Sequence, residues 1–272
     1  MIAGVFAAAP LWDFGIHVEG IFGWNINADG SLTRAGGRID PTAVALLNGE
    51  PNTLDAEKAL ALAPDLIITV TFQPDDPSQL WGIDPGAASL VSEIAPVIAI
   101  SGLQRADILV QRFAELAVAL GADLATPGLE AQRANYDAAN ERLRMAVTTT
   151  PASALFAFPE PDQVYLANPN TTADVQLFRD LGLRVLPDTD DDSESWVGVS
   201  YEEIGAYEAD LFFYATGDGA MPFDEIVAHP TLGQMPAVAS GHAVPWQQDV
   251  VFSFPGVAES LDTVATAVHS LG

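Results

Sequence analysis

The side chains that most often carry out chemistry are few in this chain and lie far apart. Cysteine is absent, and the four histidines are scattered at positions 17, 229, 242 and 269. Thiol catalysis, iron–sulfur clusters and cysteine-bound zinc are therefore excluded, and no histidine spacing predicts a metal site. The chain also lacks a nucleophile elbow, a phosphate-binding loop and a metalloprotease helix. The sequence predicts no catalytic residues, no metal ligands and no intrinsic cofactor, so we do not expect an enzyme.

One acidic loop deserves comparison with a calcium site. Asp188–Glu194 carries four aspartates and one glutamate. It lacks the glycine at position six and the acid at position twelve of a calcium-binding loop. A solvated acidic loop is the better interpretation.

The charge balance restricts the partners. Asp and Glu number 37 against 10 Lys and Arg, which gives a formal net charge of −27. Such a surface repels nucleic-acid backbones and anionic lipid headgroups, so we expect no nucleic-acid partner. It also disfavours strongly anionic ligands unless arginines gather where the ligand binds.

The order of apolar and amphipathic segments predicts an α/β fold with parallel strands. The chain has 272 residues, enough for two lobes of 100 to 150 residues. Short apolar runs alternate with helical patterns, which is typical of strand–helix–strand units. The expected strands are residues 4–7, 18–22, 66–71, 97–100, 154–158, 184–186, 211–215 and 243–245.

Two similar segments indicate two equivalent lobes. In each, a glutamate opens a short helix, an aspartate follows eight residues later, and an apolar strand begins. The first segment has Glu57 and Asp65, and the second has Glu202 and Asp210, 145 residues further on. Acidic residues favour helix N-termini, so each glutamate alone could be a helix-start residue.

A long helix is expected in the middle of the chain. Thr126 is a plausible N-cap with Pro127 at the first helical position, and the Ala-, Glu- and Arg-rich run continues through Arg144. A helix of about 20 residues is about 30 Å long, enough to join two lobes. We therefore predict an N-terminal lobe at 1–123, a linking helix at 124–146 and a C-terminal lobe at 147–272.

Three stretches resemble one family of binding proteins. They are residues 57–68 (Glu-Lys-Ala-Leu-Ala-Leu-Ala-Pro-Asp-Leu-Ile-Ile), 196–204 and 229–244. They are similar to the helix-linked class of ABC-importer solute-binding proteins, which carry ferric siderophores, cobalamin or haem. The resemblance covers nearly the whole chain. It implies two Rossmann-like α/β lobes joined by a single long helix, with the ligand in the cleft between them. It also implies that Glu57 and Glu202 dock onto arginines of a membrane permease.

Aromatic side chains are the expected ligand contacts. The resemblance places Trp196 on the second-lobe side of the cleft and Trp246 in the loop after the last strand. Phe72 and Trp81 follow a first-lobe strand, and Trp24 follows another, at the carboxyl end where α/β sheets bind ligands. Large aromatics are often core residues, and that alternative stays open for each of them.

The arginines bear on the ligand class. Siderophore binders of this family often place an arginine near a Gly-x-x-Pro-Asn stretch, but residues 47–52 here contain none. Arg38, or Arg34, could substitute. A neutral or cationic ferric hydroxamate therefore suits the chain better than a tris-catecholate.

The expected function is capture of a ferric siderophore, the iron being part of the ligand, and its delivery to an ABC permease. Cobalamin or haem is the alternative ligand, and a metal-binding or sensor protein of the same fold is a second alternative. The resemblance also implies a monomer outside the cytoplasmic membrane, and a lipid-anchored lipoprotein is one form that this class takes. We expect the export segment to be missing from this sequence.

Overall fold

The computed structural model describes residues 1–24, 26–27, 31–49, 52–189, 194–216 and 219–272. Most of the acidic loop at 188–194, and Glu50 and Pro51 of the arginine-free stretch, lie outside these residues. The chain forms two compact units. Unit 1 contains residues 1–103, 107–132 and 251–256, and unit 2 contains residues 104–106, 133–250 and 257–272. No helix within the described residues is both long and apolar enough to cross a membrane.

Unit 1 is built on a five-stranded sheet in which every pairing is parallel. The strand order is β3 (Ala45–Leu46), β2 (Gly20–Phe22), β1 (Ile2–Gly4), β4 (Ile67–Thr71) and β5 (Val97–Ser101). The central strands β1, β2 and β4 are buried throughout, as expected for a parallel sheet covered on both faces. Apolar side chains of β1, β2 and β4 pack against α2 (Ala56–Leu62) and α3 (Ala88–Ile94).

The first predicted strand, residues 4–7, is wrong. The strand ends at Gly4, and α1 (Val5–Asp13) begins at the next residue. Three consecutive alanines, Ala7–Ala9, favour a helix here more strongly than the apolar character of the run favours a strand. The other helices of this unit are α4 (Ala106–Ala119) and the 3-10 turns η1 (Arg34–Gly36) and η2 (Pro85–Ala87).

Unit 2 is built on a mixed sheet, whereas a parallel sheet was expected. Its strand order is β11 (Ala243–Trp246), β10 (Leu211–Ala215), β6 (Ser153–Pro159), β7 (Val164–Ala167) and β9 (Trp196–Val199), and β8 (Arg184–Leu186) also pairs with β6. The pairings of β7 with β6 and with β9 are antiparallel. Only four residues, 160–163, separate β6 from β7, which is enough for a hairpin but not for a parallel crossover.

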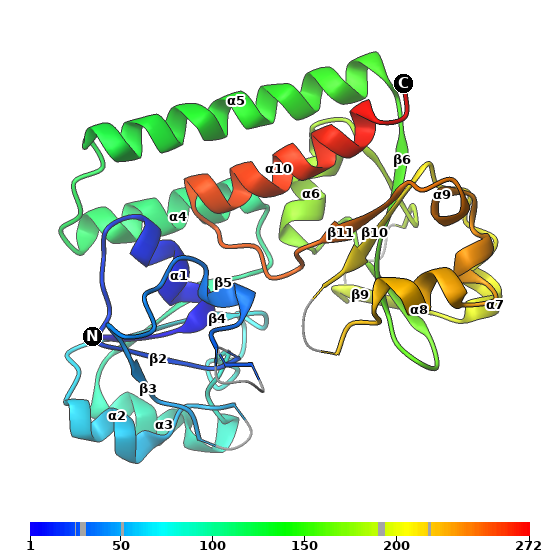
Figure 1. The fold of residues 1–272 in the computed structure, drawn as a ribbon. Helices are drawn as coiled ribbons and strands as arrows, with labels where there is room; N and C mark the ends of the chain where they lie inside the picture. Colours follow the sequence, from blue (N-terminus) through cyan, green and yellow to red (C-terminus); the bar gives the residue numbers. More distant parts are fainter. Residues whose placement is uncertain (25, 28–30, 50–51, 190–193, 217–218) are drawn as a thin grey trace. The chain divides into compact units, whose positions relative to one another are not determined.

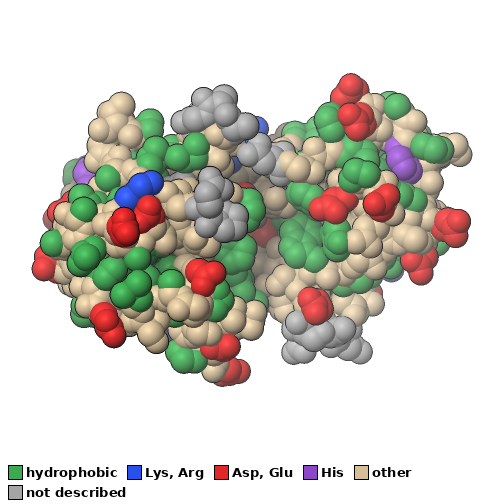
Figure 2. Space-filling view, turned by 90° about the horizontal axis from the view of Figure 1, so that it is seen from below, with side chains coloured by type: hydrophobic (Ala, Val, Ile, Leu, Met, Phe, Trp, Pro, Cys, Tyr) green, Lys and Arg blue, Asp and Glu red, His purple; other side chains and the backbone are tan. Residues whose placement is uncertain are grey.

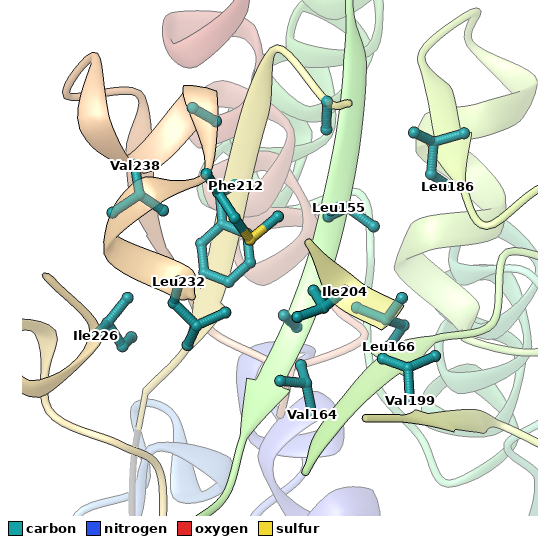
Figure 3. Packing of buried hydrophobic residues seen from close by; sticks show 14 residues of the cluster. Leu155, Val164, Leu166, Leu186, Val199, Ile204, Phe212, Ile226, Leu232 and Val238 are labelled. Atoms are coloured by element: carbon teal, nitrogen blue, oxygen red, sulfur yellow. The ribbon is translucent and has the colours of Figure 1, made fainter. Parts of the chain in front are cut away.

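The two faces of this sheet have different helices. One face packs against α7 (Tyr201–Ile204), α8 (Phe223–Ala228) and α9 (Pro236–Ala239), with the turn η3 (Leu232–Gln234) between the last two. Figure 3 shows this core, in which Phe212 and Leu155 of the sheet meet Ile204, Ile226 and Val238. The opposite face carries α6 (Ala173–Asp180), whose Phe178 ring stacks on Phe156 at 5.5 Å between centroids.

The chain passes from unit 1 to unit 2 within one long helix. This helix, α5 (Pro127–Thr149), confirms the predicted one and runs five residues beyond Arg144. The last helix, α10 (Phe254–His269), begins in unit 1 and continues in unit 2. Within unit 2 the two helices lie side by side (Figure 1), and Arg142 of α5 donates two hydrogen bonds, of 2.7 and 2.8 Å, to Asp262 of α10.

Candidate functional site

Aromatic side chains gather at the carboxyl edge of the unit 1 sheet. Because β1, β2 and β4 are parallel, the residues that follow them meet at one edge. Phe6 follows β1, Trp24 follows β2, and Phe72 follows β4. The rings of Phe72 and Trp81 meet edge to face at 5.3 Å, and Phe6 lies 5.8 Å from Trp81. Three of the five predicted aromatic residues, Trp24, Phe72 and Trp81, thus belong to one edge.

These side chains keep much of their surface open. Trp24 is 54% exposed, Phe72 40% and Trp81 37%. Large aromatic rings usually lose most of their surface in a core, and each exposed ring here leaves apolar area in water. The edge can therefore offer flat apolar surface to a ligand.

Backbone bonds fix Trp81 although it lies on a loop. Its N–H donates to the carbonyl of Val70 at 2.9 Å, and its carbonyl accepts the hydroxyl of Thr69 at 2.7 Å. The loop is thus attached along β4. Trp24 is held through the residue before it, Gly23. The Asn48 side-chain amide accepts a hydrogen bond from the Gly23 N–H (3.0 Å) and donates one to the Gly23 carbonyl (2.8 Å).

Glycines at the edge make room for the rings. A Cβ on Gly102, the residue after β5, would lie 2.5 Å from Cε1 of Phe72. Gly82 has a φ of +75°, and a Cβ there would lie 3.2 Å from the Cα of Gly23. The Trp24 and Trp81 segments therefore approach each other backbone to backbone.

Arg38 is separated from these rings. Its Nη1 lies 3.0 Å from Oδ2 of Asp13, the last residue of α1. Phe6 lies in the first turn of the same helix, and nine residues of helix extend about 13 Å. The Asp13 carboxylate also accepts the Ser253 hydroxyl at 2.5 Å, and burial raises the pKa of Asp13 although both partners oppose the rise. A role for Arg38 in ligand binding stays a prediction.

Unit 2 has an aromatic cluster on the α6 face of its sheet. The pairings Phe213↔Phe156 and Phe213↔Val244 place the side chains of Phe156 and Trp246 on one face, and those of Phe158 and Trp196 join them. Trp196 lies 6.0 Å from Trp246 and 6.2 Å from Phe158. Trp196 and Phe158 are partly exposed.

Trp246 differs from its predicted position. It is the last residue of β11 and pairs with Ala215, so it does not lie in a loop after the strand. Its ring is 2% exposed and meets Phe156 edge to face at 5.3 Å. In this structure Trp246 therefore supports Trp196 from inside the unit.

Two carboxylates accompany Trp246. Its indole N–H donates to Oδ2 of the buried Asp174, at 2.9 Å. Burial raises the pKa of Asp174 to about 6, opposed by hydrogen bonds from Trp246 and from the α6 backbone, and the charge of Asp249 adds to the rise. Burial also raises the pKa of Asp249 to about 6.

The two predicted docking glutamates lie at equivalent places in the two units. Glu57 is in the first turn of α2, which precedes β4, and Glu202 is in the first turn of α7, which precedes β10. Other side chains cap these helices: Asp55 accepts from the N–H groups of Glu57 and Lys58, while Ser200 and Glu203 form a capping box. Glu57 and Glu202 are exposed, and within the described residues their carboxylates form no hydrogen bond or ion pair. They are therefore not required as caps.

Sequence reasoning missed Phe6, Phe158 and Asp174. Phe158 could have been found from the alternation along β6, since it is two residues from Phe156. Asp174 had no signal, because only the fold brings it to Trp246, 72 residues away. Among the described residues, no three His, Asp or Glu side chains gather so as to hold a metal ion.

The model of a known family matches residues 40–250, which is most of the chain. It is described as a periplasmic binding protein. The chain belongs to the periplasmic binding protein family. A search of curated proteins gave no match.

Solved structures agree with this family. The chain is similar to DesE, a ferric-siderophore receptor protein from Streptomyces coelicolor, with 28% identity over 98% of this chain and 91% of that one, at a TM-score of 0.90. FhuD from Vibrio cholerae, bound to Fe3+-Desferal, is 18% identical over 98% of each chain, at 0.69. FeuA from Bacillus subtilis, a triscatecholate siderophore binding protein complexed with ferri-bacillibactin, is 15% identical over 99% of this chain and 92% of that one, at 0.73. The last two likenesses establish the fold alone.

Proposed function

We propose that this protein captures a ferric siderophore of the hydroxamate class and delivers it to the permease of an ABC importer. The observation that carries the proposal is the likeness to the ferric-siderophore receptor DesE, which extends over 98% of the chain. The exposed aromatic edge of unit 1 supports it, because flat apolar surface suits the hydrocarbon linkers of such chelates. The iron belongs to the ligand and not to the protein.

Charge favours a hydroxamate ligand. Similar structures bind Desferal in one case and a tris-catecholate in another, so the fold does not choose between the two classes. A ferric tris-catecholate carries several negative charges, whereas a ferric trihydroxamate is neutral or cationic. This chain has a net charge of −27, and the Arg38 guanidinium in unit 1 is already paired with Asp13. Coulomb repulsion therefore opposes the catecholate.

The proposed ligand contacts are Trp24, Phe72 and Trp81 in unit 1 and Trp196 in unit 2, with Trp246 supporting Trp196. A tryptophan-fluorescence titration with ferrioxamine B, a ferric tris-catecholate, haem and cobalamin tests this proposal. We expect saturable quenching by ferrioxamine B, weakened in Trp81→Ala and in Trp196→Ala. Trp12→Phe is the matched control, because Trp12 stacks on His17 at the other end of α1.

Other results of this titration would contradict parts of the proposal. Saturation by haem or cobalamin alone would replace the ligand, and saturation by the tris-catecholate alone would overturn the charge argument. No saturation by any of the four would contradict siderophore capture.

We also propose that Glu57 and Glu202 contact basic residues of the permease, and that the protein works outside the cytoplasmic membrane, lipid-anchored and as a monomer. Reversing both charges should leave ferrioxamine B binding unchanged but abolish iron uptake in cells that carry the variant in place of the native gene. Glu130→Lys, in the first turn of α5, is the control, because Glu130 is also an exposed helix-start acid. Normal uptake by the double variant would rule out these glutamates as docking residues.

A further inference from the structure

A buried carboxylate holds the innermost tryptophan of unit 2. Asp174 is the second residue of α6, and its Oδ2 accepts the indole N–H of Trp246 at 2.9 Å. Both side chains are 2% exposed. Since an indole can only donate, this bond fixes how the Trp246 ring is turned about its long axis.

The Trp246 ring in turn supports the exposed part of the cluster. Trp196 lies against it at 6.0 Å with an angle of 52° between the rings, and Phe156 closes it from the side at 5.3 Å. A change in the orientation of Trp246 must therefore move Trp196, because a packed interior has no spare room.

No cation of the described residues compensates the Asp174 carboxylate. Among the described residues the charged group that affects it is Asp249, three residues beyond Trp246, and no arginine, lysine or histidine does so. Arg179, the cation of α6, donates to Asn170 and Asp180 instead. In the part of the chain that the structure describes, Asp249 has no partner of opposite charge either, and burial raises its pKa to about 6. Burial favours proton uptake by both carboxyl groups in mildly acidic solution, and the charge of Asp249 adds to the rise in the pKa of Asp174.

Protonation weakens the bond that holds Trp246. An ionised carboxylate is a strong acceptor for an indole N–H, whereas a neutral carboxyl group is a weaker one and can turn its own proton toward another acceptor.

We propose that Asp174 is a positioning residue for the aromatic face formed by Trp196 and Trp246, and that protonation of Asp174, coupled to Asp249, loosens this face and weakens ligand binding. The effect on the ligand rests on the function proposed above, but the loosening of the tryptophans does not.

The first test follows the Trp246 indole N–H by ¹H–¹⁵N NMR of the full chain between pH 8 and pH 5, with Trp246→Phe to assign the signal. We expect the signal to titrate with a midpoint near pH 6. An unchanged Trp246 signal over this range would overturn the proposal, and this measurement needs no variant of either aspartate.

Variants separate Asp174 from other titrating groups. Asp174→Asn keeps a neutral acceptor oxygen and cannot titrate, so the midpoint should vanish and the signal should no longer move with pH. Asp249→Asn removes the neighbouring negative charge and should move the midpoint to lower pH. Asp180→Asn, on the same helix but paired with Arg105 at the surface, should leave it unchanged. A midpoint that persists in Asp174→Asn would assign the titration to another group and contradict the proposal.

The second test measures ferrioxamine B affinity at pH 7.5 and pH 5.5. We expect a several-fold loss at the lower pH in the wild type and none in Asp174→Asn. Equal losses in both proteins would overturn the link to ligand binding. Failure of ferrioxamine B to bind at either pH would contradict the proposed function and the link to its ligand, while the indole titration would still decide the role of Asp174.

Discussion

At the scale of single residues, the tryptophans of the two units are held by different bonds. Trp81 is fixed through its backbone, by Val70 and Thr69 of the neighbouring strand, so its ring is free to meet a partner. Trp246 is fixed through its side chain, because its indole N–H donates to Asp174, so the orientation of its ring is already determined within unit 2. Because the backbone of Trp81 is already held in place, its exposed ring loses little conformational entropy when a ligand binds.

Gly102→Ala tests how the Phe72 ring is seated. The new Cβ would lie 2.5 Å from Cε1 of Phe72, so the ring must move away from Trp81. Because Phe72 is 40% exposed, the ring can turn into solvent, and we expect a stability loss of no more than about 1 kcal/mol. Tryptophan fluorescence and ferrioxamine B affinity should nevertheless change.

Gly128→Ala in α5 is the matched control, since nothing lies within 4 Å of the added carbon. It should stabilise the helix slightly and leave the fluorescence unchanged. Unaltered fluorescence in Gly102→Ala would show that Phe72 does not depend on this glycine.

Asp249→Asn tests the cost of the acidic pair. A carboxyl group whose pKa rises from 3.8 to about 6 on folding disfavours the folded state when it is ionised, that is, at neutral pH. The variant should therefore be more stable than the wild type above pH 6, by at most about 3 kcal/mol from a shift of about two pKa units. The difference should shrink as the pH falls through 6 and vanish below 4. Urea denaturation at several pH values measures it, and a difference independent of pH would contradict the assignment.

At the scale of elements, the helix–strand segments that contain Glu57 and Glu202 occupy equivalent positions in the two sheets. β4 lies between β1 and the edge strand β5, and β10 lies between β6 and the edge strand β11. Each of these strands follows the short helix that carries the exposed glutamate. The repeated spacing in the sequence therefore reflects a repeated fold, and not only the preference of helix N-termini for acids.

Several elements could not be predicted, for identifiable reasons. β3 has only two residues, too few for any periodic pattern. β7 and β9 are four residues each, too short for a periodic pattern to identify them, and the pairing of β9 with β7 joins segments about 30 residues apart in the sequence. In contrast, the buried strands β4 and β10 have apolar runs, and α5 has a capped start followed by a long run of helix-favouring residues, so these three elements were predicted correctly.

The pair formed by Arg142 and Asp262 joins α5 to α10 with two hydrogen bonds. Both side chains are substantially exposed, so solvent screens the interaction, and a double-mutant cycle should give a coupling of about 0.5 to 1 kcal/mol. The coupling should fall as salt increases. The pair Arg144 and Glu141 within α5 serves as control and should give about 0.3 kcal/mol. Equal coupling in the two pairs would mean that Arg142 does not join the helices more strongly than a surface pair does.

At the scale of the whole molecule, charge is the dominant feature. Acidic side chains are spread over both units with few basic ones between them, as one face shows in Figure 2. Repulsion among these carboxylates keeps the protein dispersed but opposes the compact state. The same excess of negative charge attracts a basic partner surface.

Salt should therefore stabilise the protein. Raising NaCl from 10 to 200 mM shortens the screening length from about 30 Å to below 10 Å. We expect Tm to rise, by about 2 to 4 °C for each kcal/mol of repulsion that is relieved. Calorimetry with sucrose at equal osmolality is the control, because sucrose does not screen charge. A Tm that does not respond to salt would show that repulsion among the acidic side chains does not destabilise the folded protein.

The candidate site was only partly predictable. Trp24, Phe72 and Trp81 follow strands whose parallel pairing brings them to one edge, so their grouping followed from the fold class. The support of Trp246 by Asp174 did not, since it joins a helix and a strand that are distant in sequence. Arg38 was chosen by its charge alone, and its distance from the rings depends on the length of α1.

The hydrogen bond from Ser253 to Asp13 spans 240 residues of chain. On the ribosome, Asp13 leaves the exit tunnel long before Ser253 has been added. Unit 1 therefore lacks residues 251–256 until these residues have left the tunnel, and until then the Asp13 carboxylate lies in a partly formed structure. Late closure of such distant contacts slows folding and leaves a vulnerable intermediate. A nascent chain stalled before Ser253 should thus be cut readily by proteases, and one stalled a few dozen residues beyond Gly272 on a linker should resist them.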